Sequence, residues 1–338
     1  MKLKQYLIVA LLFCGHLSCS SSNPEIPVER SYSLGLTGDA SDKTTATTGG
    51  FVLMGGGADV DEAIKWMIAK SGGGDVVVIR ASGGNAYNSY IYGLGNVNSV
   101  ETLLISSNNA ANDPKVATTI RNAEALFIAG GDQSQYLKLW ANTPVQQAID
   151  YLVNEKKVPV GGTSAGCAIL GQFIYTGENG SIISSEALSN PFLNTMTFSE
   201  GRFVNIPLLD NLITDTHYSQ RDRQGRHFTM LARLVNEKKT AVKGLGVDEN
   251  TAACLDTDGT MSVYGSGNAF YLESVNDLPE QCQAAKPLSW NASQKAVAAY
   301  IAKGSTTGTS FIKLGAITAQ PTEYWFALDG KFTRAVNP

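Results

Sequence analysis

The sequence predicts an α/β fold with a doubly wound, mostly parallel sheet, and two patterns lead to that prediction. From residue 49 onward, short and continuously apolar runs alternate with amphipathic stretches, which is typical of parallel strands covered by helices on both faces. From about residue 250 the apolar runs are separated by turn signals such as Asp258-Gly259, which indicates an antiparallel, hairpin-rich extension. We expect both parts to form one domain over residues 49–338.

The individual elements follow this alternation. One helix is predicted at residues 63–68, where apolar residues recur at helical spacing before a run of glycines. A second is expected to begin after Thr143, with Pro144 at its first position and Gln146 completing a capping box. Strands are predicted at residues 51–54, 76–79, 102–105, 126–129 and 158–160, and hairpin strands at 252–255, 261–264 and 270–272.

The N-terminus has the pattern of an export signal. Two lysines precede an apolar run at residues 6–14, which is too short to span a bilayer. The run leads into Leu-Ser-Cys ending at Cys19 and then into three serines, so residues 1–19 resemble a lipoprotein signal with Cys19 as the lipidated residue. Cleavage of an ordinary signal peptide is the alternative. We expect an exported protein, periplasmic or on the cell surface and lipid-anchored to the membrane, with residues 20–48 as a tether or irregular lead-in.

Composition excludes several classes of protein. The 338 residues carry a net charge of −4, which provides no basic field for nucleic acid. The five cysteines form no disulfide framework, although a Cys254–Cys282 bridge is left open. The sequence contains no pair of cysteines at C-x-x-C spacing and no zinc-like pattern, so we expect neither a metal nor a cofactor.

The strongest chemical signal is the segment Gly162-Thr163-Ser164-Ala165-Gly166, which directly follows a predicted strand. An apolar stretch at residues 167–173 can continue it as a helix. A strand, a sharp turn and a helix are the context of a nucleophile elbow, in which glycines leave room around the serine hydroxyl. The pattern therefore predicts Ser164 as a nucleophile.

A serine nucleophile needs a base, and the sequence offers few. Besides His16 in the predicted signal, the chain contains only His217 and His227. His217 follows an apolar segment at a predicted strand end, where sites of parallel sheets collect, whereas His227 has the pattern of a surface histidine in a helix. The order nucleophile, histidine, acid is favoured over that of an α/β-hydrolase, in which the histidine comes last.

Four further motifs, together with the serine motif, make the sequence similar to one known family. The segments Asp-Thr-His-Tyr-Ser-Gln-Arg-Asp-Arg-Gln-Gly-Arg at residues 215–226 and Gly-Val-Asp-Glu-Asn-Thr-Ala at 246–252 accompany the serine motif, and Gly130-Gly131-Asp132-Gln133 follows a predicted strand. With Met54-Gly-Gly-Gly57, they resemble the cyanophycinase branch of the peptidase E-like serine peptidases. The resemblance covers roughly residues 49–275.

The resemblance implies a three-layer α/β/α fold like that of class I glutamine amidotransferases, with residues 49–338 as a peptidase domain. It also implies a metal-free triad with Ser164 as nucleophile, His217 as general base and Glu249 as the residue that orients the imidazole. Asp215 and Asp248 remain alternatives for the acid. The backbone N–H groups of Gly131 and Ala165 would form the oxyanion hole.

The resemblance also suggests a substrate. Cyanophycin is a polyaspartate chain that carries arginine on each side-chain carboxyl group, and a cyanophycinase releases β-Asp-Arg dipeptides from it. The matching substrate-binding residues here are Gln133, Arg221, Arg223 and Arg226, whose guanidinium groups can hold carboxylates. An Asp-X or isoaspartyl dipeptidase is the nearest alternative activity, and a non-catalytic peptide-binding lipoprotein is the alternative of another class. A homodimer is left open.

Overall fold

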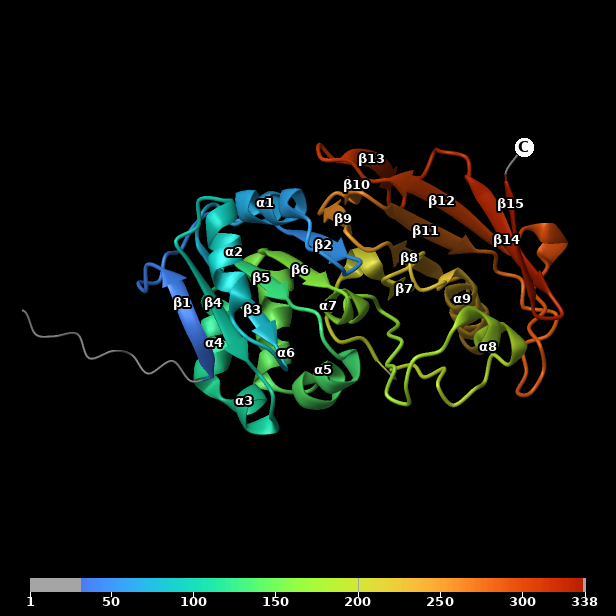
Figure 1. The fold of residues 1–338 in the computed structure, drawn as a ribbon, viewed down its shortest axis with the longest axis horizontal. Helices are drawn as coiled ribbons and strands as arrows, with labels where there is room; N and C mark the ends of the chain where they lie inside the picture. The colour runs from blue at the N-terminus through green and yellow to red at the C-terminus, as the bar shows by residue number, and fades with distance from the viewer. Residues whose placement is uncertain (1–31, 200, 337–338) are drawn as a thin grey trace, which may run out of the picture.

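The computed structural model describes residues 32–199 and 201–336 (Figure 1). The predicted signal at residues 1–19, with Cys19, and the first part of the predicted lead-in lie outside this range. In the part of the chain that is described, the strands form one sheet of nine strands and another of six, and no helix is long and apolar enough to cross a membrane.

The larger sheet has a parallel centre. Its strand order is β1-β4-β3-β5-β6-β2-β9-β10-β13, in which β4, β3, β5, β6 and β2 run parallel and the strands at both ends are antiparallel. The strands are β1 (Ser33–Gly38), β2 (Gly50–Met54), β3 (Asp75–Arg80), β4 (Ser99–Leu104), β5 (Ala125–Ile128), β6 (Pro159–Thr163), β9 (Thr251–Asp256), β10 (Thr260–Gly265) and β13 (Thr309–Lys313).

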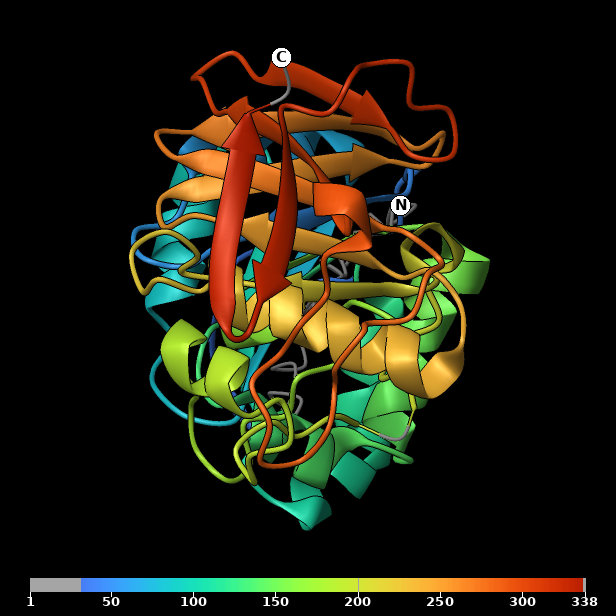
Figure 2. The same ribbon diagram turned by 90° about the vertical axis from the view of Figure 1, so that its right-hand side faces the viewer.

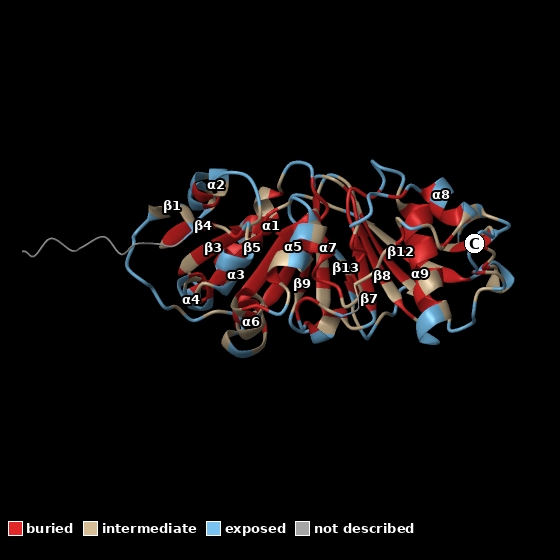
Figure 3. Ribbon diagram, turned by 90° about the horizontal axis from the view of Figure 1, so that it is seen from below, coloured by how far each residue is buried: buried red, intermediate tan, exposed pale blue. Residues whose placement is uncertain are grey.

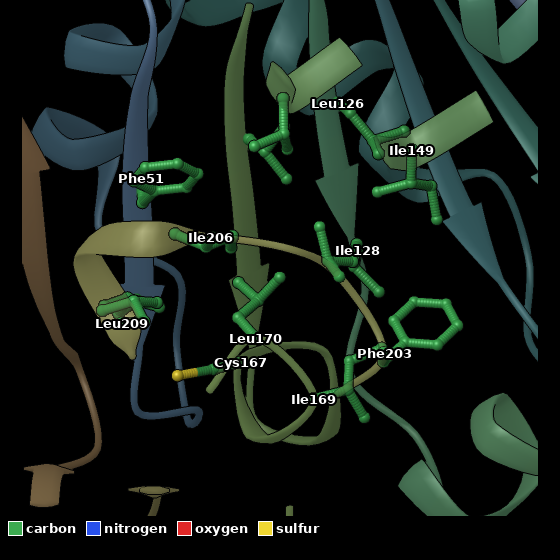
Figure 4. Packing of buried hydrophobic residues seen from close by; sticks show 14 of the residues in the cluster. Phe51, Leu126, Ile128, Ile149, Cys167, Ile169, Leu170, Phe203, Ile206 and Leu209 are labelled. Carbon is green, nitrogen blue, oxygen red and sulfur yellow. The ribbon is translucent and has the colours of Figure 1, made fainter. Parts of the chain in front are cut away.

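Helices cover both faces of the parallel centre, which confirms the predicted α/β architecture. Side chains alternate between the two faces of a strand, so Val76 and Val78 pack under α1 (Asp61–Lys70) and α2 (Ala86–Leu94). Val77 and Ile79 belong to the core on the opposite face, part of which is shown in Figure 4. The helices there are α3 (Asn108–Asn112), α4 (Pro114–Asn122), α5 (Gln133–Trp140) and α6 (Pro144–Tyr151), which a π-helical turn (Leu152–Lys156) extends.

A second sheet continues the fold where hairpins were predicted. Its order is β15-β14-β12-β11-β8-β7, with β7 and β8 parallel and the other pairs antiparallel. One face carries α9 (Gln224–Lys238) and α8 (Ser184–Ser189), as Figure 2 shows. The central strands of both sheets are buried, whereas β1, β13 (Thr309–Lys313) and β15 are partly exposed (Figure 3). The strands are β7 (Leu212–Asp215), β8 (Lys243–Val247), β11 (Asn268–Ser274), β12 (Val297–Lys303), β14 (Glu323–Leu328) and β15 (Lys331–Val336).

Three local predictions are wrong. Residues 33–38, expected to be irregular, form β1 because their backbone pairs with the edge of β4. No capping box closes the start of α6, since the Gln146 side chain accepts a hydrogen bond from the backbone N–H of Asn142 rather than from that of Thr143. The helix after the serine turn, α7 (Ala165–Ala168), is a single turn. The bridge left open is also not formed, because Cys254 and Cys282 are free, buried thiols.

Candidate active site

Ser164 occupies a sharp turn between β6 and α7. Its backbone has φ 51° and ψ −115°, a conformation that non-glycine residues rarely adopt and that is typical of a nucleophile elbow. The flanking glycines are required by packing, because a Cβ atom at Gly162 would lie 2.5 Å from the backbone of Gly166, and one at Gly166 would lie 2.1 Å from the carbonyl oxygen of Ile128. The turn thus presents the hydroxyl at the carboxyl end of the parallel strands.

Three side chains form a continuous line of hydrogen bonds at this edge. Ser164 Oγ lies 2.7 Å from His217 Nε2, and His217 Nδ1 lies 2.6 Å from Glu249 Oε1. The carboxylate accepts the proton of Nδ1, which leaves Nε2 as the basic nitrogen that faces the serine hydroxyl. The structure therefore brings together the three residues that the sequence analysis placed in one catalytic triad.

The histidine and the acid of the triad lie at the ends of two neighbouring strands. His217 follows β7 and Glu249 follows β8, and these two strands are parallel neighbours in the second sheet. The histidine backbone N–H donates to Gly55 O at 2.8 Å, and the N–H of Glu249 donates to Gln220 Oε1 at 2.9 Å. Ser164 comes from the first sheet, so the line of hydrogen bonds joins both sheets.

Gly56 is a structural requirement of the site that its sequence motif did not reveal. Its φ is +92°, and a Cβ atom there would lie 2.4 Å from Cε1 and 2.6 Å from Nε2 of His217. The bare Cα therefore forms the surface against which the imidazole lies. The sequence signal was present in the run Met54-Gly-Gly-Gly57, but nothing in the sequence indicated what the glycines contact.

Replacing Gly56 by alanine is expected to lower kcat by at least about 10-fold, because the new methyl group displaces the imidazole from Ser164 and the positive φ adds backbone strain. Gly84→Ala is the matched control, since a Cβ atom at Gly84 meets nothing within 4 Å. Steady-state kinetics of both variants test this. Equal rates for both variants would mean that the imidazole does not depend on this contact.

The surroundings of His217 favour its neutral form. Burial lowers the pKa of this imidazole below its ordinary value, the nearby Arg221 and Arg223 lower it further, and the hydrogen bond to Glu249 opposes them in part. A general base must be unprotonated, and a lowered pKa keeps it unprotonated at lower pH.

The acid limb of kcat/KM against pH is therefore expected to have its midpoint below the ordinary histidine pKa of about 6.5. Arg221→Gln removes a positive charge near the imidazole and should move the midpoint upward. Arg121→Gln, on the distant helix α4, should leave it unchanged. A wild-type midpoint above about 6.5 would contradict the inferred environment of His217.

The predicted oxyanion-hole residues border the same cleft as the serine. Gly131 and Ala165 line a cavity of about 170 Å³ together with Ser164 and His217. Ala165 is the first residue of α7, where backbone N–H groups lack partners within the helix. Gly131 follows β5, the strand beside β6, so both residues meet at one edge of the sheet.

The four predicted substrate-binding residues, Gln133, Arg221, Arg223 and Arg226, all line this cleft. Gln133 starts α5, and its Nε2 lies 3.4 Å from Tyr175 O. The Arg221 side chain is 53% exposed and lies 3.9 Å from Glu249 Oε1. Arg223 is more buried and donates to Thr216 O at 2.8 Å. Arg221 thus retains donors for an incoming anion.

Arg226 requires a correction to its predicted role. Its Nε and Nη2 donate to the two carboxylate oxygens of Asp215 at 2.8 and 2.6 Å, and its Nη1 reaches Ser181 Oγ and Ile182 O. The side chain is 3% exposed. Each guanidinium nitrogen is therefore engaged within the protein, and Arg226 supports the cleft wall rather than offering donors to a substrate.

The alternatives considered for the acid and the base have other contacts. Asp215 pairs with Arg226, and Asp248 accepts hydrogen bonds from the backbone N–H groups of Ser219 and Asn268. His227, expected on the surface, is fully buried because α9 packs that face against the second sheet. Among residues 32–199 and 201–336, His, Cys, Asp and Glu side chains form no group able to hold a metal ion.

The chain is similar to curated cyanophycinases over part of its length. A curated cyanophycinase of Synechococcus elongatus is 27% identical over 185 residues, which cover 55% of this chain and 52% of the relative. A curated cyanophycinase of Geminocystis herdmanii is 32% identical over 148 residues, covering 44% of this chain and 48% of the relative. The chain thus spans about half the length of the curated relatives it matches.

The crystal structure of a peptidase from an acI-B1 Actinobacterium has a TM-score of 0.48 and 16% identity, over 66% of this chain and 90% of that chain. The family model described as peptidase family S51 matches residues 52–263, which is more than half of the chain and includes Ser164, His217 and Glu249. The chain belongs to peptidase family S51.

Proposed function

We propose that this protein is a serine peptidase that acts through an acyl-enzyme on Ser164. The observation that carries the proposal is the unbroken line from Ser164 Oγ through the His217 imidazole to Glu249, with contacts of 2.7 and 2.6 Å. A serine hydroxyl becomes a useful nucleophile only beside an oriented base, and this line supplies both the base and its orientation. The match to the model of peptidase family S51 supports the same class of reaction. So does the similarity to the curated cyanophycinases, although the chain spans only about half of their length.

The reaction follows from the positions of these groups. Ser164 Oγ attacks the carbonyl carbon of the scissile bond while Nε2 of His217 takes the hydroxyl proton. The tetrahedral oxyanion accepts hydrogen bonds from the N–H groups of Gly131 and Ala165. The imidazolium, held by Glu249, then gives its proton to the leaving amine, and water attacks the acyl-enzyme with the same histidine as base.

The proposed substrate is cyanophycin, cleaved to β-Asp-Arg dipeptides. Each arginine attached to cyanophycin keeps a free α-carboxylate, and the cleft lining includes Arg221 and Arg223 beside the triad. The curated relatives are named cyanophycinases. We further propose that the protein is exported and anchored to the membrane through Cys19. Its substrate would then be a polymer outside the cell.

An Asp-X or isoaspartyl dipeptidase is the second candidate. The observation that favours it is the size of the cleft, about 170 Å³, which suits a short peptide better than an extended chain. Both candidates share the same nucleophile and base, so they differ only in which acyl groups the cleft accepts.

One experiment separates these candidates. Wild-type protein and Ser164→Ala are incubated with cyanophycin and with α- and β-Asp-X dipeptides, and the products are identified by mass spectrometry. We expect β-Asp-Arg from the polymer with wild-type protein alone. Cleavage of dipeptides alone would replace the cyanophycin proposal by the dipeptidase. Absence of any cleavage, together with failure of a serine-directed phosphonate to label Ser164, would favour a non-catalytic peptide-binding protein.

A further inference from the structure

The turn that carries His217 is held in an unusual conformation. His217 itself has φ 48°, a left-handed conformation that persists only where neighbouring structure enforces it. The turn holds itself together in part through its own backbone, since Arg221 N–H donates to His217 O at 3.1 Å and Arg223 N–H donates to Tyr218 O at 2.9 Å. These bonds fix the shape of the turn but do not fix it relative to Glu249.

Tyr218, the next residue, ties the turn to the strand that carries the acid. Its side chain is fully buried, and its backbone N–H donates to Val247 O at 3.2 Å. The ring lies directly on Gly246 of β8, where a Cβ atom would come within 2.4 Å of it. Phe270 of β11 packs beside it, with ring centroids 5.0 Å apart.

His227 of α9 completes this anchor. Its Nδ1 lies 2.9 Å from the Tyr218 hydroxyl, and the two rings meet edge to face at 5.4 Å. Its Nε2 faces Gly244, where a Cβ atom would lie 2.7 Å away. Gly244 and Gly246 are two residues apart on one strand, so they share a face of β8 and make room for both rings.

Tyr218 and His227 are both expected to be uncharged, so the hydrogen bond between them joins two neutral groups. Burial lowers the pKa of His227 to about 4 and raises the pKa of Tyr218 well above its ordinary value. Both groups are therefore uncharged at neutral pH. A neutral imidazole nitrogen that accepts the phenolic proton costs no buried charge.

We propose that the Tyr218–His227 hydrogen bond is a positioning device that sets the catalytic base His217 against Glu249 and Ser164. Neither residue touches the reacting atoms. Tyr218 acts through its peptide link to His217, and His227 acts by fixing the ring of Tyr218 on Gly246 of β8, three residues before Glu249. This inference rests on the proposed serine chemistry, and its test is chosen so that the two can fail separately.

The test measures the rate at which a fluorophosphonate labels Ser164, a reaction that needs an activated serine but no particular substrate. Tyr218→Phe and His227→Leu each remove the hydrogen bond and should slow labelling roughly 10-fold or more, as a displaced catalytic group does. The double variant should be no slower than either single one, because both changes remove the same interaction. His227→Asn offers an amide oxygen near the position of Nδ1 and should restore most of the rate.

Tyr271→Phe is the matched control, since Tyr271 is also buried but lies on the opposite face of the same sheet, where its hydroxyl is 3.3 Å from Glu273. The inference is overturned if Tyr218→Phe labels as fast as Tyr271→Phe, or if His227→Asn is as slow as His227→Leu. Near-UV circular dichroism monitors the fold, and if Tyr218→Phe loses its native signal, the comparison of His227→Asn with His227→Leu decides alone. Absence of labelling in the wild-type protein would instead refute the proposed function.

Discussion

Ser164→Ala is expected to lower turnover by roughly 10⁴- to 10⁶-fold, and His217→Ala by a similar factor. Ser164 is the group that forms the covalent bond, and its only basic neighbour in the hydrogen-bonded line is His217 Nε2 at 2.7 Å. Without either group the other has no function in acyl transfer, so the two losses should not add. The double variant is therefore expected to be about as active as each single one.

The measurement is kcat on the best peptide of the substrate panel, with active-site titration to correct for contaminating hydrolases. Residual activity should remain from the oxyanion hole and substrate binding. The control is Ser199→Ala, a serine whose hydroxyl contacts Gly201 O on an exposed loop. Turnover of Ser164→Ala within 10-fold of the wild-type value would exclude an acyl-enzyme on this residue.

Asp215→Asn is expected to lower the free energy of unfolding by about 3–5 kcal/mol. Arg226 and Asp215 are both nearly inaccessible and form a bidentate pair. The amide keeps the size of the side chain but leaves the guanidinium buried without a counter-charge, which is the costly half of removing a buried ion pair. The Arg226 contacts with Ser181 and Ile182 should loosen at the same time.

Urea denaturation monitored by tryptophan fluorescence gives the free energy of unfolding. Asp210→Asn is the control, because Asp210 pairs with Arg202 at the surface and exposed pairs contribute less than about 1 kcal/mol. Arg226→Met should destabilise less than Asp215→Asn, because Arg223 still lies 3.6 Å from the Asp215 carboxylate and partly compensates its charge. Equal stability of Asp215→Asn and wild-type protein would show that solvent reaches the pair.

The centre of the fold was predictable because its signals are local. Buried parallel strands have continuously apolar sequences. The predicted bounds of β2, β3 and β5 therefore differ from the observed bounds by no more than one residue. The edge strand β1 has no such run, and each of its residues is half-buried or exposed. The hairpins were visible, but their division between two sheets depends on long-range pairing, such as β9 with β2 and β11 with β8.

The candidate site shows the same division between local and distant information. Ser164 could be predicted because a strand and glycines surround it, and His217 because few histidines were available. The error over Arg226 arose because three arginines in one segment look alike in sequence. The fold places Arg221 toward the solvent and Arg226 against Asp215. Likewise, the sequence around Gly56 does not indicate that this residue contacts the imidazole of His217 in the folded protein.

Because β8 pairs with β11, the position of Glu249 depends on residues that lie beyond the segment matched by the family model. The family match ends at residue 263, yet β11 starts at Asn268 and bonds along all of β8. Asn268 also donates to the Asp248 carboxylate next to Glu249. Sequence changes in residues 264–338 can therefore alter the position of Glu249 without changing a residue of the triad. Exchanging residues 264–338 between relatives is expected to alter the rate while leaving Ser164, His217 and Glu249 in place.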